Sequence, residues 1–529
     1  MNTTPEHFAR LVAALLQPEA YPDPVERVEL VETHISYLFL TGRHVYKVKK
    51  PVDFGFLDFT SLDQRRYYCE QEVAVNRRIA PQVYLGVVEI REQGERYAVD
   101  GPGVTVEYAV KMLQLPRDLA LSVLLPQNRV SEQDIRRLAV KIAEFHRSAA
   151  TGPEIVAEGG PSVLRQNVAE NFQQTERYVG FTLSRAVYAD LRAYSRAYLR
   201  VKDPVLRLRA EQGRVRDCHG DLHTAQIFLE NGISIIDSIE FNHRFRYCDV
   251  ALDLAFLAMD LDHFSHPELS DLLVRAYVTA SDDPGVADLL AFGKQYRAYV
   301  RGKVTSFRLD HPEELSEAEQ QEIAGTARSY FELAHSYLPV PGQPALFIFG
   351  GLMGSGKSTL SQRLARHWNL VYLSSDLIRK ELAGLEAADR QYVAYGEGIY
   401  SAEFSRRTYE VLLERADRHL AAGQSVALDA SFHTADARRQ ALDLGRRRQA
   451  RRWLVECVAS DAELRRRLER REAQGGAASD GRLELLQRQR DDWEPVREVP
   501  PEGYVRLDTS GSQEQSLDRL LQEIYARLV

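Results

Sequence analysis

The chain has 529 residues, of which 44% are hydrophobic and 27% are charged, with a formal net charge of −8. This composition is typical of a globular protein with buried cores, and the negative charge argues against a protein that coats nucleic acid. The four cysteines are scattered without a C-x-x-C spacing, which favours a reducing cytoplasm over a disulfide framework or a zinc site. No apolar run is long enough to span a membrane, so we expect no membrane partner.

Short runs typical of β-strands open the chain, at 28–31, 37–40 and 44–49. Lys47 and Lys49 stand two residues apart on the third run and therefore share one face of it, so either could point into a cleft. The helix predicted at 64–79 carries Glu72, and we favour Lys47 and Glu72 as an ion pair that holds phosphate. The alternative is that both lysines are solvated on an edge strand.

A loop with two carboxylates lies in the middle of the chain. Residues 218–229 read C-H-G-D-L-H-T-A-Q-I-F-L, and a short turn leads from them to an apolar run that ends at Asp237. A loop that carries Asp221, next to a hairpin ending in Asp237, brings a carboxylate for a substrate hydroxyl close to a carboxylate for Mg²⁺. This pairing indicates phosphoryl transfer.

These segments resemble the aminoglycoside phosphotransferase family, whose fold is that of protein kinases. The stretches that carry the resemblance are I-A-E-F-H at 142–146, H-G-D-L-H at 219–223, I-I-D at 235–237 and D-V-A-L-D-L-A at 249–255. The resemblance implies that Asp221 is the general base or the carboxylate that positions the acceptor hydroxyl. It also implies that Asp237 is a Mg²⁺ ligand.

Two positions depart from the pattern of that family. Gln226 stands where the family usually carries an asparagine that ligates the metal, and its side chain is one methylene longer, so it must retract to hold the same ion. The turn at 32–36 contains no glycine where protein kinases place a glycine-rich loop. Phosphate would therefore have to be gripped there by hydroxyl and N–H groups.

The proline-rich stretch at 339–344 is the clearest boundary in the chain. We therefore predict a first domain at 1–338, a linker at 339–344 and a second domain at 345–529. The predicted fold class is α/β and α+β: a bilobal, protein-kinase-like domain followed by a doubly wound parallel sheet of the P-loop type.

A glycine-rich loop at 351–358, G-L-M-G-S-G-K-S, lies between an apolar run and a stretch with helical periodicity. A strand that leads through such a turn into a helix N-terminus directs several N–H groups at one point and binds the phosphates of a nucleoside triphosphate. Lys357 can reach the β and γ phosphates, and the Ser358 hydroxyl can ligate Mg²⁺. The residues predicted to bind nucleotide here are Gly351, Gly354, Ser355, Gly356, Lys357, Ser358 and Thr359.

Three further elements complete this predicted site. Asp376 follows a short strand and can accept a substrate hydroxyl proton, while Arg379 on the same helical face can hold an anionic group; the alternative is that Asp376 is a helix N-cap. Asp429 ends an apolar strand and could hold the water shell of Mg²⁺. Arg467 and Arg471, one helical turn apart and followed by a Gly-rich stretch, suit a lid that closes on phosphate, or else form a solvated basic face.

The C-terminal pattern resembles P-loop kinases that include polynucleotide 5′-kinase, gluconate kinase and zeta-toxin-type kinases. No Asn-Lys dipeptide occurs, so the guanine-reading motif of GTPases is absent. The whole chain resembles bacterial proteins described as bifunctional aminoglycoside phosphotransferase and ATP-binding proteins. The resemblance implies ATP and Mg²⁺ as cofactors.

The sequence therefore predicts a cytoplasmic, two-headed kinase in which each domain transfers a γ-phosphoryl group to a hydroxyl of a small molecule, sugar or nucleotide. A nucleic-acid end is a less favoured acceptor. One alternative is that only the P-loop domain is catalytic and the first domain recognises substrate. Another is a nucleotide-gated regulatory or toxin-neutralising protein that binds ATP without turnover.

Overall fold

The computed structural model describes residues 5–53, 55, 57–230, 232–386, 397–474 and 483–529. The chain forms two compact units. The first contains Met1–Leu183 and Lys202–Tyr337, and the second contains Ser184–Val201 and Leu338–Val529. A segment from the middle of the chain is thus part of the C-terminal unit, an insertion that a division at a single linker does not include.

The first unit begins with a six-stranded antiparallel sheet in the order β1-β2-β3-β6-β4-β5. The strands are β1 (Glu29–Glu32), β2 (Ser36–Leu40), β3 (His44–Lys49), β4 (Tyr84–Gln93), β5 (Arg96–Val99) and β6 (Val104–Leu113). Helix α1 (Pro5–Leu15) packs on β5, and α2 (Leu62–Asn76) packs on β4 and β6. The Ser61 hydroxyl accepts from the backbone N–H of Gln64 in a capping box that starts α2.

The rest of the first unit is mainly helical. Its helices are α3 (Leu121–Leu124), α4 (Glu132–Ser148), α5 (Pro153–Gly159), α6 (Pro161–Thr175), α8 (Asp203–Glu211), α9 (His243–Arg246), α10 (Val250–His263), α11 (Pro267–Ser281), α12 (Val286–Phe307) and α13 (Glu317–Ser336). Two short antiparallel pairs lie among them, β7 (Val215–Asp217) with β10 (Tyr247–Asp249), and β8 (Ile227–Phe228) with β9 (Ser234–Ile235). Helix α10 is buried along nearly its whole length, which explains its continuous apolar sequence.

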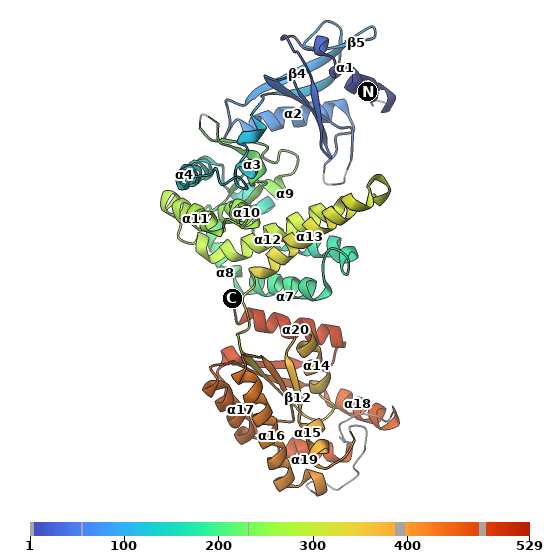
Figure 1. Cartoon of the computed structure of the whole chain (residues 1–529), viewed down its shortest axis with the longest axis vertical. Helices are drawn as coiled ribbons and strands as arrows, with labels where there is room; N and C mark the ends of the chain where they lie inside the picture. Colours follow the sequence, from blue (N-terminus) through green and yellow to red (C-terminus); the bar gives the residue numbers. More distant parts are fainter. Residues whose placement is uncertain (1–4, 54, 56, 231, 387–396, 475–482) are drawn as a thin grey trace. The chain divides into compact units, whose positions relative to one another are not determined.

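The second unit contains a five-stranded sheet in the order β12-β13-β11-β14-β15, with every neighbouring pair parallel. The strands are β11 (Ala345–Gly350), β12 (Val371–Ser374), β13 (Val426–Asp429), β14 (Arg451–Val458) and β15 (Tyr504–Asp508). The helices are α14 (Lys357–His367), α15 (Ser375–Leu382), α16 (Ala402–Ala421), α17 (Ala435–Arg447), α18 (Asp461–Gln474), α19 (Leu483–Asp491) and α20 (Gln513–Ala526). All of β11 is buried because helices cover both faces of the sheet (Figure 1).

Helix α7 (Arg185–Val201) is the inserted segment, and it lies along α20 (Figure 1). The carboxylate of Asp190 accepts from His367 Nε2 at 2.9 Å and from Trp368 Nε1 at 3.2 Å, at the C-terminal end of α14. The rings of Tyr194 and Tyr525 meet edge to face at 5.7 Å. Helix α7 is therefore an integral part of the second unit's packing.

The predicted fold class is confirmed for both units. A second capping box starts α4, where the Ser131 hydroxyl accepts from the Asp134 N–H. The strand-like runs predicted at 28–31, 37–40 and 44–49 correspond to β1, β2 and β3. None of the helices in the described ranges is long and apolar enough to cross a membrane.

Candidate active sites

Lys47, Glu72 and Asp237 meet in the first unit, although they come from β3, α2 and a loop far along the chain. Lys47 Nζ lies 2.8 Å from Glu72 Oε1 and 2.6 Å from Asp237 Oδ1. Burial alone would lower the pKa of Lys47, but the two carboxylates outweigh it and raise the pKa well above its ordinary value. Lys47 is therefore a permanent cation that faces the predicted metal ligand.

Lys49 also contacts Glu72, but on the other carboxylate oxygen. Its Nζ lies 2.8 Å from Glu72 Oε2, and it forms a second ion pair with Glu240. The side chain of Lys49 is completely buried, whereas that of Asp237 is 39% exposed. Of the two candidate lysines, Lys47 is thus the one placed beside Asp237, and Lys49 lies behind it.

Gln226 and Asp237 form the predicted metal pair of this unit. Gln226 Nε2 donates to Asp237 Oδ2 at 3.2 Å, so the longer amide does reach the carboxylate. Asp237 has a positive φ of 66°, and its backbone N–H donates to the hydroxyl of Tyr84 at 3.0 Å. A non-glycine residue in this conformation is held by its surroundings and is often functional.

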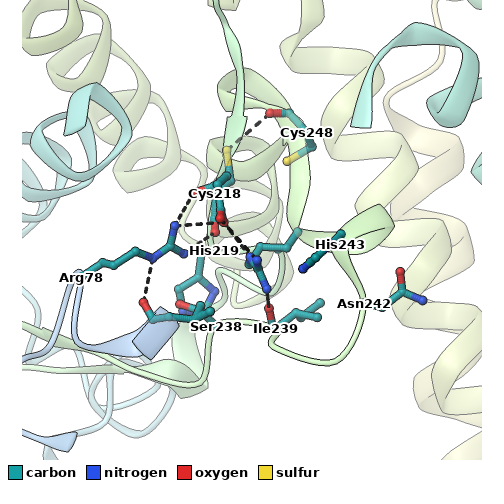
Figure 2. Close-up of polar contacts among 12 residues, drawn as sticks. Arg78, Cys218, His219, Ser238, Ile239, Asn242, His243 and Cys248 are labelled. Atoms are coloured by element: carbon teal, nitrogen blue, oxygen red, sulfur yellow. Dashed lines mark hydrogen bonds and ion pairs between the residues drawn. The ribbon is translucent and has the colours of Figure 1, made fainter. Parts of the chain in front are cut away.

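The loop that carries Asp221 is anchored from behind by Asp253. The two oxygens of Asp253 accept from the backbone N–H groups of His219 and Gly220 at 3.0 and 2.9 Å, and Oδ2 also contacts His146 Nε2. On the approach to the loop, Arg78 donates to the carbonyls of Asp217 and Cys218, and the His219 carbonyl accepts from the Ile239 N–H (Figure 2). These bonds fix the loop, so Asp221 projects from a rigid support.

The surroundings of Asp221 are cationic. Its Oδ2 lies 3.3 Å from His223 Nε2, and its side chain is 35% exposed. Burial would raise the pKa of Asp221, but His223 and the Arg301 guanidinium outweigh it, so the pKa lies below its usual range. Arg301 is on α12 one turn after Arg297, whose Nη1 donates to the Gly220 carbonyl at 3.0 Å. The Nε of Arg301 is buried and has no hydrogen-bond partner among the described residues.

The glycine-free turn between β1 and β2 is closed by its own hydrogen bonds. The Thr33 N–H donates to the Ser36 carbonyl, and the Ser36 N–H donates to the Thr33 hydroxyl, each at 2.9 Å. The N–H groups of Thr33 and Ser36 therefore donate within the turn and are not available to a phosphate.

The P-loop of the second unit runs from β11 into α14. Gly351, Gly354 and Gly356 have φ values of 148°, 79° and 82°, a region that suits glycine. A Cβ on Gly351 would collide with the Cys457 carbonyl, and a Cβ on Gly354 would lie 3.1 Å from the Leu464 carbonyl. Glycine is thus required for this path of the backbone, which ends at the N-terminus of α14, where anions are stabilised. Ser355 is buried inside the loop, and Thr359 is exposed in the first turn of α14.

Asp429 lies beside the start of α14. It is 3% exposed; its Oδ2 accepts from the Tyr372 hydroxyl at 2.6 Å, and its Oδ1 has no partner among the described residues. Burial raises the pKa of Asp429, while Lys357 and the hydroxyls of Tyr372 and Ser358 act in the opposite direction. A buried carboxylate oxygen without a partner, near Lys357 and Ser358, fits a hydrated Mg²⁺.

Asp376 and Arg379 both lie on α15. The N-cap of α15 is Ser374, so the alternative that Asp376 caps the helix is wrong; Asp376 is in the first turn and half-buried. Arg379 is 7% exposed, and its Nη1 donates to the Ile399 carbonyl at 2.6 Å and to the Ser405 hydroxyl at 3.0 Å. Arg379 thus also holds the chain before α16.

Arg467 on α18 contacts the P-loop directly. Its Nη1 lies 3.3 Å from the Gly354 carbonyl, and its Nη2 donates to the Thr509 carbonyl. Helices α18 and α19 pack on the loop through an apolar cluster of Met353, Leu464, Leu468 and Leu486. The side chain of Arg471 and the Gly-rich stretch at 475–479 lie outside the described residues.

Ser431 and His433, which follow β13, form a polar pair that was not predicted from the sequence. The Ser431 hydroxyl contacts His433 Nδ1 at 3.0 Å and the Tyr409 hydroxyl at 3.2 Å. Between them Phe432 is buried at a φ of 46°, an unusual conformation for an aromatic residue. Burial lowers the pKa of His433, so its ring is neutral at pH 7. The pair lies beyond the carboxyl end of the sheet, where ligands bind in this fold. The sequence signal that could have indicated it is the Asp-x-Ser-x-His spacing at 429–433.

Comparison with known proteins agrees with this geometry. Residues 346–496 match the family model described as an AAA domain, so the second unit carries a P-loop domain of that kind. An uncharacterized protein of Mycobacterium tuberculosis (strain ATCC 25618 / H37Rv) is 27% identical over 496 residues, which cover 93% of this chain and 94% of that protein. The family match and the P-loop geometry support phosphotransferase activity in general.

Two solved structures are also similar. The GDP complex of aminoglycoside 2′-phosphotransferase-IIIa is 14% identical, covers 62% of this chain and 98% of its own, and has a TM-score of 0.39. A gluconokinase from Sinorhizobium meliloti 1021 is 19% identical, covers 34% of this chain and 91% of its own, and has a TM-score of 0.25. The P-loop resemblance of the C-terminal half is confirmed by the family match over residues 346–496.

Proposed function

We propose that the protein is a two-headed, Mg²⁺-dependent kinase that uses ATP in both units. The observation that carries the proposal is the glycine cradle at 351–358, next to a buried Asp429 with an unpartnered oxygen. Phosphoryl transfer needs positioning and charge neutralisation rather than covalent catalysis, and this arrangement supplies both.

In the second unit, Lys357 and the N–H groups of the P-loop bind the β and γ phosphates. Ser358 and Asp429 hold Mg²⁺, which neutralises phosphate charge when it is bound. Asp376 accepts the proton of the acceptor hydroxyl, and Arg467 closes on the phosphates from α18. The Ser431 hydroxyl and the His433 ring contact the acceptor.

In the first unit, Lys47 holds the phosphates and Glu72 positions Lys47. Asp237 and Gln226 hold Mg²⁺, and Asp221 accepts the proton of the acceptor hydroxyl. Arg301, with its unpartnered Nε, favours an acceptor that carries a negative or neutral group over a polycationic aminoglycoside.

The test is transfer of the labelled γ-phosphoryl group of ATP to a metabolite extract by the full chain. Lys357→Ala should remove one set of labelled products and Asp237→Ala another, with neither change affecting the other set. If neither variant alters the products, the assignment of both sites is wrong. Kanamycin, as a polycationic probe, should not be labelled.

A single active head is the second candidate. The self-closed turn at Thr33–Ser36 and the Lys47–Asp237 ion pair favour it, because both occupy groups that a nucleotide would use. In that case Asp237→Ala leaves every labelled product unchanged and only Lys357→Ala has an effect.

A further inference from the structure

Lys49 is a second buried lysine on β3 to which the proposed chemistry assigns no role. Its side chain has no exposed surface, and its Nζ lies 4.9 Å from the centre of the Phe59 ring. Removing an ammonium group from water is costly unless its partners are well placed. Both partners are carboxylates: Glu72 from α2, and Glu240 from the loop that follows Asp237.

The charged groups form one continuous series. Asp237 pairs with Lys47, Lys47 with one oxygen of Glu72, the other oxygen of Glu72 with Lys49, and Lys49 with Glu240. Asp237 and Glu240 are three residues apart in the same loop, so the series starts and ends on that loop. The loop that contains Asp237 and Glu240 is therefore tied to β3 and α2 at two separate points.

A neutral contact ties α2 to the same loop. Asn76, one turn after Glu72, accepts from the Ser238 N–H at 2.8 Å and donates to the Ser238 carbonyl at 3.5 Å. The position of α2 relative to the loop thus depends on more than the Lys47 pair.

Nucleotide binding would act differently on the two lysines. Phosphates attract Lys47, and a metal ion competes with Lys47 for Asp237, so the Lys47–Asp237 ion pair weakens when Mg²⁺ and ATP bind. Lys49 has no exposed surface and keeps both of its carboxylates. In protein kinases a single lysine both holds phosphate and fixes the helix glutamate.

We propose that Lys49 is a positioning residue and that the two lysines share these roles between them. Lys49, together with Glu240, holds Glu72 and α2 in place, while Lys47 is free to move from Asp237 to the phosphates. This inference rests on the proposed function of the first unit, which must bind Mg²⁺ and ATP. Lys49 itself does not touch the nucleotide.

The test uses the full chain carrying Lys357→Ala, which silences the P-loop, and titrates it with a fluorescent ATP analogue and Mg²⁺. Asp237→Ala in this background should abolish the remaining binding and so assigns it to the first unit. Lys49→Met should weaken that binding about 10- to 100-fold, because Glu72 then loses one of the two charged hydrogen bonds that hold it beside Lys47.

Lys49→Met also leaves Glu240 buried without its cation, so it will lower the melting temperature. The double variant Lys49→Met/Glu240→Gln removes the stranded charge, and its melting temperature should recover while nucleotide binding stays weak. Recovery of both together would show a merely structural role and overturn the inference.

The titration distinguishes a failure of the proposed function of the first unit from a failure of the role of Lys49. If the Lys357→Ala parent binds no nucleotide, the proposed function of the first unit fails, and the inference fails with it. If the parent binds and both Lys49 variants bind equally well, only the role of Lys49 is refuted.

Discussion

Asp429→Asn should raise the stability of the metal-free protein and lower its affinity for Mg²⁺. The carboxylate is 3% exposed and its pKa is raised by burial, so at pH 7 its charge costs folding free energy in the absence of metal. The amide has nearly the same shape, can still accept from Tyr372, and carries no charge. The melting temperature of the metal-free protein should therefore rise.

The affinity for Mg²⁺ should fall in the same variant. A carboxylate that orients the water shell of a metal is worth about 10- to 100-fold in metal affinity, or roughly 1.4 to 2.8 kcal/mol. Isothermal titration of the ATP-saturated full chain with Mg²⁺ measures this loss, and Asp237→Ala in the background removes the first unit's contribution. A variant that binds Mg²⁺ like the parent would refute the assignment.

The pH dependence has a definite sign. A raised pKa means that the charge of Asp429 costs stability at neutral pH, and this cost disappears as the pH falls below the unfolded value near 4. The stability gap between the parent and Asp429→Asn should therefore shrink from pH 7 toward pH 4. Mg²⁺ binding by the parent should weaken over the same range, at a higher pH than for an ordinary aspartate.

Three further outcomes follow from the same geometry. Asp376→Asn should abolish transfer by the second unit but change its ATP affinity less than twofold, because a general base acts on the acceptor; equal loss of both, measured by product labelling and nucleotide titration, would contradict this role. Gln226→Asn should keep or raise transfer by the first unit, since the shorter amide still reaches a metal at Asp237, and steady-state rates with a labelled acceptor decide it. Asp190→Ala should lower the stability of the second unit by about 2 to 4 kcal/mol, because it leaves two partly buried donors, His367 and Trp368, without this acceptor. Asp518→Ala removes two partly exposed ion pairs to α7 and is the matched control; it should cost less than about 1 kcal/mol in the same denaturation assay.

The P-loop could be predicted almost completely because its function depends on consecutive residues. The spacing of Gly351, Gly356 and Lys357 is local, and a strand on one side and a helix on the other are visible in the periodicity. The Lys47–Glu72 pair could be predicted from a strand lysine followed by a helix glutamate. No feature of the sequence indicates that Asp237, far along the chain, joins them.

Other features depend on tertiary structure and have no local signal. Whether Lys47 or Lys49 faces the cleft depends on how Glu72 and Glu240 approach β3, not on the two-residue period that the lysines share. The Ser431–His433 contact depends on the unusual φ of Phe432 between them. Helix α7 has the amphipathic pattern of an ordinary surface helix, and that pattern does not say which unit will cover its apolar face.

The place of α7 in the chain has a consequence for synthesis. Its docking partner α20 is made after it, and roughly 300 residues separate the two. At ordinary translation rates of about 5 to 20 residues per second, α7 waits some 15 to 60 s for α20 after leaving the ribosome. During this interval Tyr194 cannot yet make its ring contact with Tyr525, so the packing of α7 is completed only after α20 has left the ribosome.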